Sequence, residues 1–83
     1  MYSVYAICSD VDARIYVGFT DNISRRLLKH NSGKTKSTKG FAPWVLIYSE
    51  QVSDRQDARN REVFLKGGSG KEFLKSIRDK HVL

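Results

Sequence analysis

The stretch RIYVGFTDNISRRLLKH, residues 14–30, decides the fold because it joins a strand directly to a helix. Its first part, Arg14–Phe19, has the β-branched and aromatic side chains that are typical of a strand. The helix that follows can be capped by Thr20 or Asp21 and extends to about Asn31. The stretch therefore predicts a strand and a helix that are joined by a tight turn.

The predicted helix carries an apolar stripe beside a polar one. The apolar stripe, which we expect to be buried, comprises Ile23, Leu27 and Leu28. Asn22, Arg26 and His30 are spaced i, i+4 and i+8, so they border that stripe. An arginine and a histidine placed just beyond an aromatic strand end suggest that this region holds an anion.

Upstream of this stretch, the segment Tyr2–Cys8 has the composition of another strand, and the polar residues 9–12 follow it as a turn. Two strands so close in sequence are most simply paired as an antiparallel hairpin. A turn centred on residues 10–12 brings Tyr5 near Tyr16. We therefore expect two phenols side by side on one face of the hairpin.

Downstream, residues 31–40 form a basic loop without apolar side chains. The apolar run Trp44–Tyr48 suits a central strand that is buried on both faces. Ser53 or Asp54 can cap the second long helix, and its end at Gly67–Gly68 allows a left-handed glycine.

A capping box at Ser69–Glu72 predicts a last, short helix. This helix is expected to pack Phe73, Leu74 and Ile77. The element order is then β-β-α-β-α-α, an α/β fold in which helices flank a small three-stranded antiparallel sheet. Eighty-three residues suffice for one domain with a modest core, so we expect a single domain over residues 1–83.

The composition is that of a globular protein, with 40% hydrophobic and 29% charged residues. No run of 18 apolar residues predicts a membrane span, and the N-terminus lacks the basic segment of a secretory signal. The single cysteine, Cys8, excludes an internal disulfide and a multi-thiolate zinc site, and fits a core position. We expect an intracellular, cytoplasmic protein.

The charge is the most informative bulk property. Fifteen Lys and Arg against nine Asp and Glu give a net charge of +6. For so small a domain this balance favours nucleic acid or another polyanion as partner, although a basic protein without such a partner is the alternative.

Glu62 is unusual because it shares a helix face with Ala58 and Leu65, which should be buried. A carboxylate on a buried stripe is costly unless it is paired or binds a metal. An ion pair with Arg59, Arg61 or Arg26 and a role as metal ligand are therefore both open.

Four other residues also have a structural and a chemical interpretation. Arg26 is either a surface arginine or a phosphate ligand, because its fork of donors fits phosphate oxygens. His30 is either a surface histidine or a partner for a leaving oxygen. Tyr5 and Tyr16 are either packing residues or phenols that orient a water molecule.

The basic loop is the clearest candidate for nucleic-acid binding. Lys34, Lys36 and Lys39 alternate with small residues, so ammonium and backbone N–H groups can approach phosphates together. Arg25, beside Arg26, is a further candidate. A solvated loop without a ligand is the alternative.

Taken together, these residues resemble the GIY-YIG nuclease family, in its small stand-alone single-domain branch. Its two signature tripeptides correspond to Ser3–Val4–Tyr5 and Tyr16–Val17–Gly18. Arg26 and His30 correspond to the catalytic arginine and to the His or Tyr one helical turn later, and Glu62 to the metal-binding glutamate. Three departures are Ser3 for the first glycine, Phe19 where relatives can carry lysine, and the lack of an asparagine after position 60.

The resemblance implies an endonuclease that hydrolyses phosphodiester bonds with Mg²⁺ or Mn²⁺ held by Glu62. The tyrosines would position and deprotonate water, with help from the positive charge of Arg26, which would also clamp the scissile phosphate. DNA is the expected substrate, cut according to its structure (branched or single-stranded) in repair or recombination. The alternatives are a non-catalytic nucleic-acid-binding module and a nuclease subunit of a larger complex.

Overall fold

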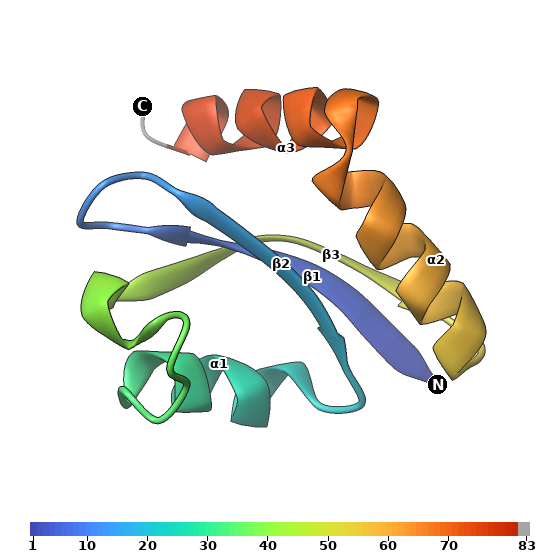
Figure 1. The fold of residues 1–83 in the computed structure, drawn as a ribbon, viewed down its shortest axis with the longest axis horizontal. Coiled ribbons are helices and arrows are strands. Elements are labelled where there is room, and N and C mark those ends of the chain that lie inside the picture. The colour runs from blue at the N-terminus through green and yellow to red at the C-terminus, as the bar shows by residue number, and fades with distance from the viewer. Residues whose placement is uncertain (82–83) are drawn as a thin grey trace.

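The computed structural model describes residues 1–81, and it has the element order predicted from the sequence (Figure 1). The elements are β1 (Tyr2–Ser9), β2 (Ile15–Thr20), α1 (Ile23–Asn31), the 3-10 helix η1 (Lys39–Phe41), β3 (Trp44–Val52), α2 (Arg55–Lys66) and α3 (Gly68–His81). The strands form one antiparallel sheet in the order β2-β1-β3, which confirms the predicted fold class. None of the helices within residues 1–81 is long and apolar enough to cross a membrane.

The sheet is covered on both faces, with α1 on one side and α2 and α3 on the other (Figure 1). Side chains alternate along β1, so its residues serve both layers. Val4, Ala6 and Cys8 pack with Ala58, Leu65 and Leu74 of α2 and α3. Tyr5 and Ile7 pack with Trp44 and with Ile23 and Leu27 of α1. The face that carries Tyr5 is thus the face covered by α1.

The predicted hairpin is confirmed. Its turn spans residues 10–12, and Tyr5 pairs with Gly18 while Ile7 pairs with Tyr16. Tyr5 and Tyr16 are therefore diagonal neighbours on one face, with ring centroids 6.4 Å apart. Gly18 lies directly opposite Tyr5, which leaves open space for the phenol at the β2 edge of the sheet.

The prediction of a central strand at Trp44–Tyr48 is wrong, because β3 is an edge strand and β1 is central. A register shift opposite Ala6 and Ile7 explains the apolar run. Leu46 packs toward α1, whereas Ile47 and Tyr48 both pack toward α2 and α3. Consecutive apolar residues of an edge strand thereby serve both faces.

Two details of α1 also differ from the prediction. The N-cap is Asn22, whose side chain accepts a hydrogen bond from the Arg25 N–H at 3.0 Å, rather than Thr20 or Asp21. Leu28 is 70% exposed, whereas His30 is completely buried. With the helix beginning at Ile23, the face toward the sheet includes positions 23, 27 and 30, so Leu28 points outward.

The last two helices are only partly as expected. Asp54 caps α2 as predicted, but Gly67 at its end has φ −85° and is not left-handed. The last helix begins at Gly68 and has 14 residues, so it is not short and Ser69 lies inside it rather than in a capping box.

The packing of α3 follows from a close contact with α2. A Cβ at Gly70 would collide with the α2 backbone near Leu65, so glycine is required for this approach. Leu74 is buried and Ile77 packs on the core as predicted, whereas Phe73 is 45% exposed and contacts Tyr48 through a ring edge.

Candidate active site

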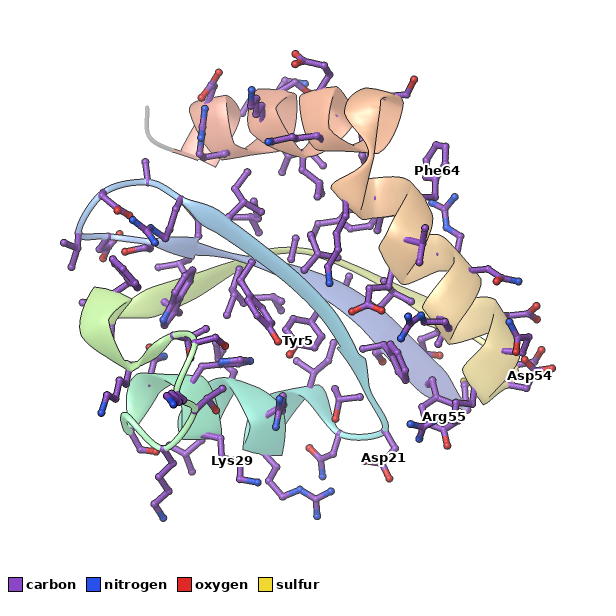
Figure 2. The ribbon with its side chains drawn as sticks, in the orientation of Figure 1. Tyr5, Asp21, Lys29, Asp54, Arg55 and Phe64 are labelled. Carbon is purple, nitrogen blue, oxygen red and sulfur yellow. The ribbon has the colours of Figure 1, made fainter. Side chains whose placement is uncertain are left out.

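Tyr5 and His30 form a buried hydrogen bond between the central strand and α1. The Tyr5 hydroxyl lies 2.9 Å from His30 Nε2, and the two residues are 2% and 0% exposed. Figure 2 shows Tyr5 in the layer between the sheet and α1. The interpretation of His30 as a surface histidine is therefore wrong.

Thr38 completes the hydrogen bonding of the imidazole and indicates its tautomer. His30 Nδ1 lies 2.9 Å from Thr38 Oγ1, and the Thr38 hydroxyl donates to the Thr35 carbonyl at 3.4 Å. Because the hydroxyl proton is used there, we assign Nδ1 as the donor to Thr38 and Nε2 as the acceptor from Tyr5. Burial, followed by the charge of Arg26, lowers the pKa of His30, so the imidazole is neutral near pH 7. Thr38, His30 and Tyr5 thus form a chain that can accept the phenolic proton.

Arg26 brings positive charge to the two phenols. Its interaction with the Tyr5 hydroxyl, and more weakly with that of Tyr16, raises the pKa of Arg26. Burial raises the pKa of Tyr5, and this effect outweighs the lowering by Arg26. The arginine therefore supplies the field expected from the sequence, but Tyr5 keeps its proton near neutral pH. Any role of Tyr5 as a base requires its own proton to leave toward His30.

Tyr16 lies beside the hydrogen-bonded chain of Tyr5, His30 and Thr38 and is not part of it. Its ring centroid is 4.9 Å from that of His30 and 6.4 Å from that of Trp44. Trp44 is a core residue, as expected, and its indole N–H donates to the Thr38 carbonyl at 3.0 Å. The aromatic rings thereby hold the imidazole from several sides.

Gly18 explains why the second tripeptide ends in glycine. A Cβ at this position would lie 2.8 Å from the Tyr5 hydroxyl oxygen and 3.2 Å from the Tyr16 ring. Real Cβ atoms essentially never approach so closely, so any larger residue would displace the phenol. The missing side chain lets the Tyr5 hydroxyl reach the β2 edge.

Glu62 approaches the same edge from α2, on the other side of the sheet from α1. Its negative charge is one of the causes that raise the pKa of Tyr5. The side chain is 15% exposed and pairs with Lys66 at 3.1 Å and with Arg59 at 4.0 Å. The predicted ion pair with Arg59 therefore exists, but the closer partner is Lys66, which was not predicted. Arg61 pairs instead with Glu50 at 2.8 Å.

The donor set at Glu62 fits a weakly held Mg²⁺ or Mn²⁺ rather than a preformed cage. Within residues 1–81, no group of three or more His, Cys, Asp or Glu side chains could hold a metal. Mg²⁺ commonly takes one or two carboxylates and completes its shell with water and substrate phosphate oxygens. A single, partly exposed carboxylate is compatible with that pattern.

The candidate nucleic-acid-binding residues lie outside this cluster. Lys34, Lys36 and Lys39 are exposed, and Arg25 is exposed and pairs with Asp21 at 3.3 Å. The loop itself is anchored, because Thr38 is completely buried. Asn31 adds a second anchor by donating to the Trp44 carbonyl at 3.1 Å.

The site contains two residues whose roles were not foreseen from the sequence, Thr38 and Lys66. Thr38 stands among lysines in a polar loop, and nothing in the sequence distinguishes it from Thr35. Lys66 could have been recognised, because it lies four residues after Glu62, the spacing of a helical ion pair.

The chain is similar to known proteins. Residues 1–75 match the family model described as the GIY-YIG catalytic domain. A UPF0213 protein of Staphylococcus haemolyticus is 39% identical over 70 residues, which cover 83% of this chain and 85% of that protein. A UPF0213 protein of Streptococcus pneumoniae is 36% identical over 76 residues, with coverages of 87% and 77%.

A solved structure is also similar. The solution NMR structure of a UPF0213 protein from Bacillus halodurans has a TM-score of 0.55 and 32% sequence identity, and the match covers 93% of this chain and 85% of that one. The family match extends over the strands, α1 and α2 that carry the tyrosines, Arg26, His30 and Glu62. This chain therefore belongs to the GIY-YIG family, together with the small UPF0213 proteins.

Proposed function

We propose that this protein, acting as a single domain over residues 1–83, is an endonuclease that hydrolyses phosphodiester bonds in DNA with the help of a divalent metal ion. The observation that carries the proposal is the chain from Tyr5 through His30 to Thr38, with Arg26 against the phenol. A buried phenol and a neutral imidazole held in this order are suited to moving a proton. Family membership adds that nucleases of this kind generally use divalent metals.

In the proposed reaction, Tyr5 Oη takes a proton from the attacking water while its own proton passes to His30 Nε2. The new bond joins the water oxygen to phosphorus, and the bond from phosphorus to the leaving oxygen breaks with its electron pair going to that oxygen. The leaving oxygen then takes a proton from a solvent water, and His30 returns its extra proton to solvent through Tyr5 after the products leave. Arg26 stabilises the charge that develops on the phosphate. A divalent ion, when bound, would supply additional charge neutralisation at the phosphate, and Glu62 would hold it.

Substrate binding would also help His30 to accept this proton. The positive charge of Arg26 is one cause of the lowered pKa of His30. A bound phosphate would neutralise that charge and so make the imidazole more basic when the water is attacked. Tyr5 is therefore our assignment for the general base, and Tyr16 orients the water or the phosphate.

We further propose selectivity for branched or single-stranded DNA, a role in repair or recombination, and a cytoplasmic location. The support is the small size of the domain, the charge of +6 and the exposed lysines of the basic loop, which offer point charges rather than a base-reading helix. Contacts to phosphates provide affinity without base-sequence information. Lys34, Lys36, Lys39 and Arg25 remain proposed phosphate contacts at the loop.

The test is incubation of the purified protein with branched, single-stranded and duplex DNA, and with the equivalent RNAs, in Mg²⁺, Mn²⁺ or EDTA. Cleavage should require the metal, and Glu62→Gln should abolish it while the protein stays folded. Glu72→Gln is the matched control, because Glu72 is an exposed glutamate on α3 that pairs only at 3.7 Å with Lys75. Cleavage by Glu62→Gln at the normal rate would refute the role of Glu62.

A nuclease subunit that requires a partner is the second candidate, because α2 exposes apolar side chains. Val63 and Phe64 are 57% and 50% exposed, and Phe64 projects from the outer side of α2 (Figure 2). Binding of DNA without cleavage by the isolated chain would favour this candidate or a binding module over a self-sufficient enzyme.

A further inference from the structure

One stripe of α2 carries positive charge on both sides of Glu62. Arg55, Arg59, Glu62 and Lys66 are spaced i, i+4, i+7 and i+11, so they share one side of the helix. This side lies along β2, since the Arg55 guanidinium is 5.5 Å from the Phe19 ring centroid. Figure 2 shows Arg55 at the start of α2, near the end of β2 that leads to Asp21. Glu62 is the single carboxylate in this row.

Beyond Lys66 the row continues into a basic groove between β2 and the α2–α3 layer. The groove has a volume of about 460 Å³, and no acidic side chain lines it. Its floor is apolar and includes Ile15, Val17 and Leu74. Its charged lining residues are Arg14, Lys66, Lys71, Lys75 and Arg78. Tyr16 is also among the lining residues, although its ring lies on the α1 face beside His30, so the groove borders the strand that carries one of the two phenols.

On the other side of Glu62, the start of α2 and the end of β2 form a second hollow of about 370 Å³. Its lining residues are Phe19, Arg55, Gln56 and Arg59. It again contains no carboxylate, and its Arg59 is the residue that contacts Glu62 at 4.0 Å. An aromatic ring next to two guanidinium groups is suited to a nucleotide, because it offers stacking together with phosphate contacts.

The existing ion pairs of these cations are weak enough to be replaced by phosphate. Three of these pairs, at 2.7–3.7 Å, join side chains that are at least partly exposed: Lys75 with Glu72, Arg78 with Asp79 and Arg14 with Asp12. Lys66 pairs with Glu62. Exposed pairs of this kind contribute little. Within the part of the chain that the structure describes, Arg55 and Lys71 form no ion pair, so they are free for a ligand.

We propose that a nucleic-acid strand lies along the β2 edge, held through its phosphates by the two hollows, with the scissile phosphate at Glu62 between them. The inference rests on the proposed nuclease function and adds the path of the substrate. From Arg55 to Lys66 the helix spans about 16 Å, at 1.5 Å per residue. That length corresponds to roughly five phosphates of one strand of a duplex. The basic loop of Lys34–Lys39, on the α1 side, is then at most an auxiliary contact.

The experiment measures binding rather than cleavage, in EDTA, with a fluorescent 20-nucleotide single strand and the corresponding duplex at several salt concentrations. The test variant is Arg55→Gln with Lys71→Gln, which removes one charge on each side of Glu62. The matched control is Lys29→Gln with Lys80→Gln, which removes two exposed charges that line neither hollow. Lys29 points away from the sheet (Figure 2).

The test variant should lose roughly two phosphate contacts. The slope of log affinity against log salt should then become shallower by about 1.4–1.8, and the affinity near 0.1 M salt should fall by roughly 25- to 60-fold. The control should keep the slope and affinity of the unmodified protein. An unchanged slope in the test variant, or an equal loss in the control, would overturn the proposed path.

The outcome separates this inference from the nuclease proposal. A protein that binds through the hollows but does not cut DNA in Mg²⁺ or Mn²⁺ would retain the path and refute the nuclease function. A protein that cuts DNA, while the Arg55 and Lys71 variant binds normally, would retain the nuclease function and refute the path.

Discussion

The replacement of Tyr5 by phenylalanine tests the proposed proton chain most directly. The change removes one oxygen atom and keeps the ring, so the packing against Tyr16 and His30 is preserved. His30 Nε2 then loses its donor while it remains completely buried. A buried polar atom left without a partner costs about 1–3 kcal/mol in free energy of unfolding. For a domain of this size, each kcal/mol lowers Tm by roughly 4–8 °C.

The effect on the reaction should be larger than the effect on stability. Loss of a general base typically lowers the rate by ~10² to 10⁴. Urea unfolding would measure the stability change, and cleavage of a labelled DNA in Mg²⁺ would measure the rate. A variant that remains folded at the assay temperature but cuts at least ~10²-fold more slowly would support the role of the hydroxyl.

Tyr48→Phe is the matched control, because it deletes a phenolic hydroxyl that donates to Glu50 at 2.8 Å on β3. Glu50 keeps two hydrogen bonds from Arg61, so the expected cost is about 1 kcal/mol or less and the cleavage rate should not change. If Tyr5→Phe and Tyr48→Phe retained equal cleavage rates, Tyr5 would be a packing residue and the proton chain would be refuted.

The remaining predictions concern the surroundings of Tyr5. Gly18→Ala should lower the cleavage rate and cost about 1–3 kcal/mol in stability, because the new Cβ would lie 2.8 Å from the Tyr5 hydroxyl; a fully active variant would contradict this packing. Folding lowers the pKa of His30, so the neutral imidazole contributes to the free energy of unfolding in full above pH 6.5, and this contribution is lost as the pH falls below that value. The free energy of unfolding of His30→Gln, measured over the same pH range, should lack this decrease. Lys66→Gln should strengthen Mn²⁺ binding, measured by water proton relaxation, by up to roughly fivefold, because Lys66 competes for Glu62 in an exposed pair. Unchanged or weaker Mn²⁺ binding would show that Glu62 is not the ligand.

The fold could be predicted from the sequence as far as local patterns determine it. The hairpin, the order of elements and the cap at Asp54 depend on neighbouring residues, and all three are confirmed. The central position of β1 is a tertiary property, and the apolar run Trp44–Tyr48 was misleading because a register shift lets one edge strand serve both faces. The start of α3 at Gly68, one residue before the supposed capping box, is also decided by packing, since Gly70 lies against α2.

The residues of the candidate site could be predicted from the sequence, but the contacts between them could not. Spacing alone placed Tyr5 beside Tyr16, but it left open whether His30 is a surface histidine or a partner for a leaving oxygen. The structure buries His30, because the face of α1 toward the sheet includes positions 23, 27 and 30. This burial makes the histidine the acceptor of a buried phenolic proton rather than a solvated side chain. It also changes the argument about the base, since burial raises the pKa of Tyr5 more than Arg26 lowers it. A protonated phenol can act on water only if a neutral acceptor lies behind it, and the neutral acceptor here is His30, held by a threonine of the basic loop. The loop therefore contributes to the proposed chemistry through Thr38, whatever its lysines bind.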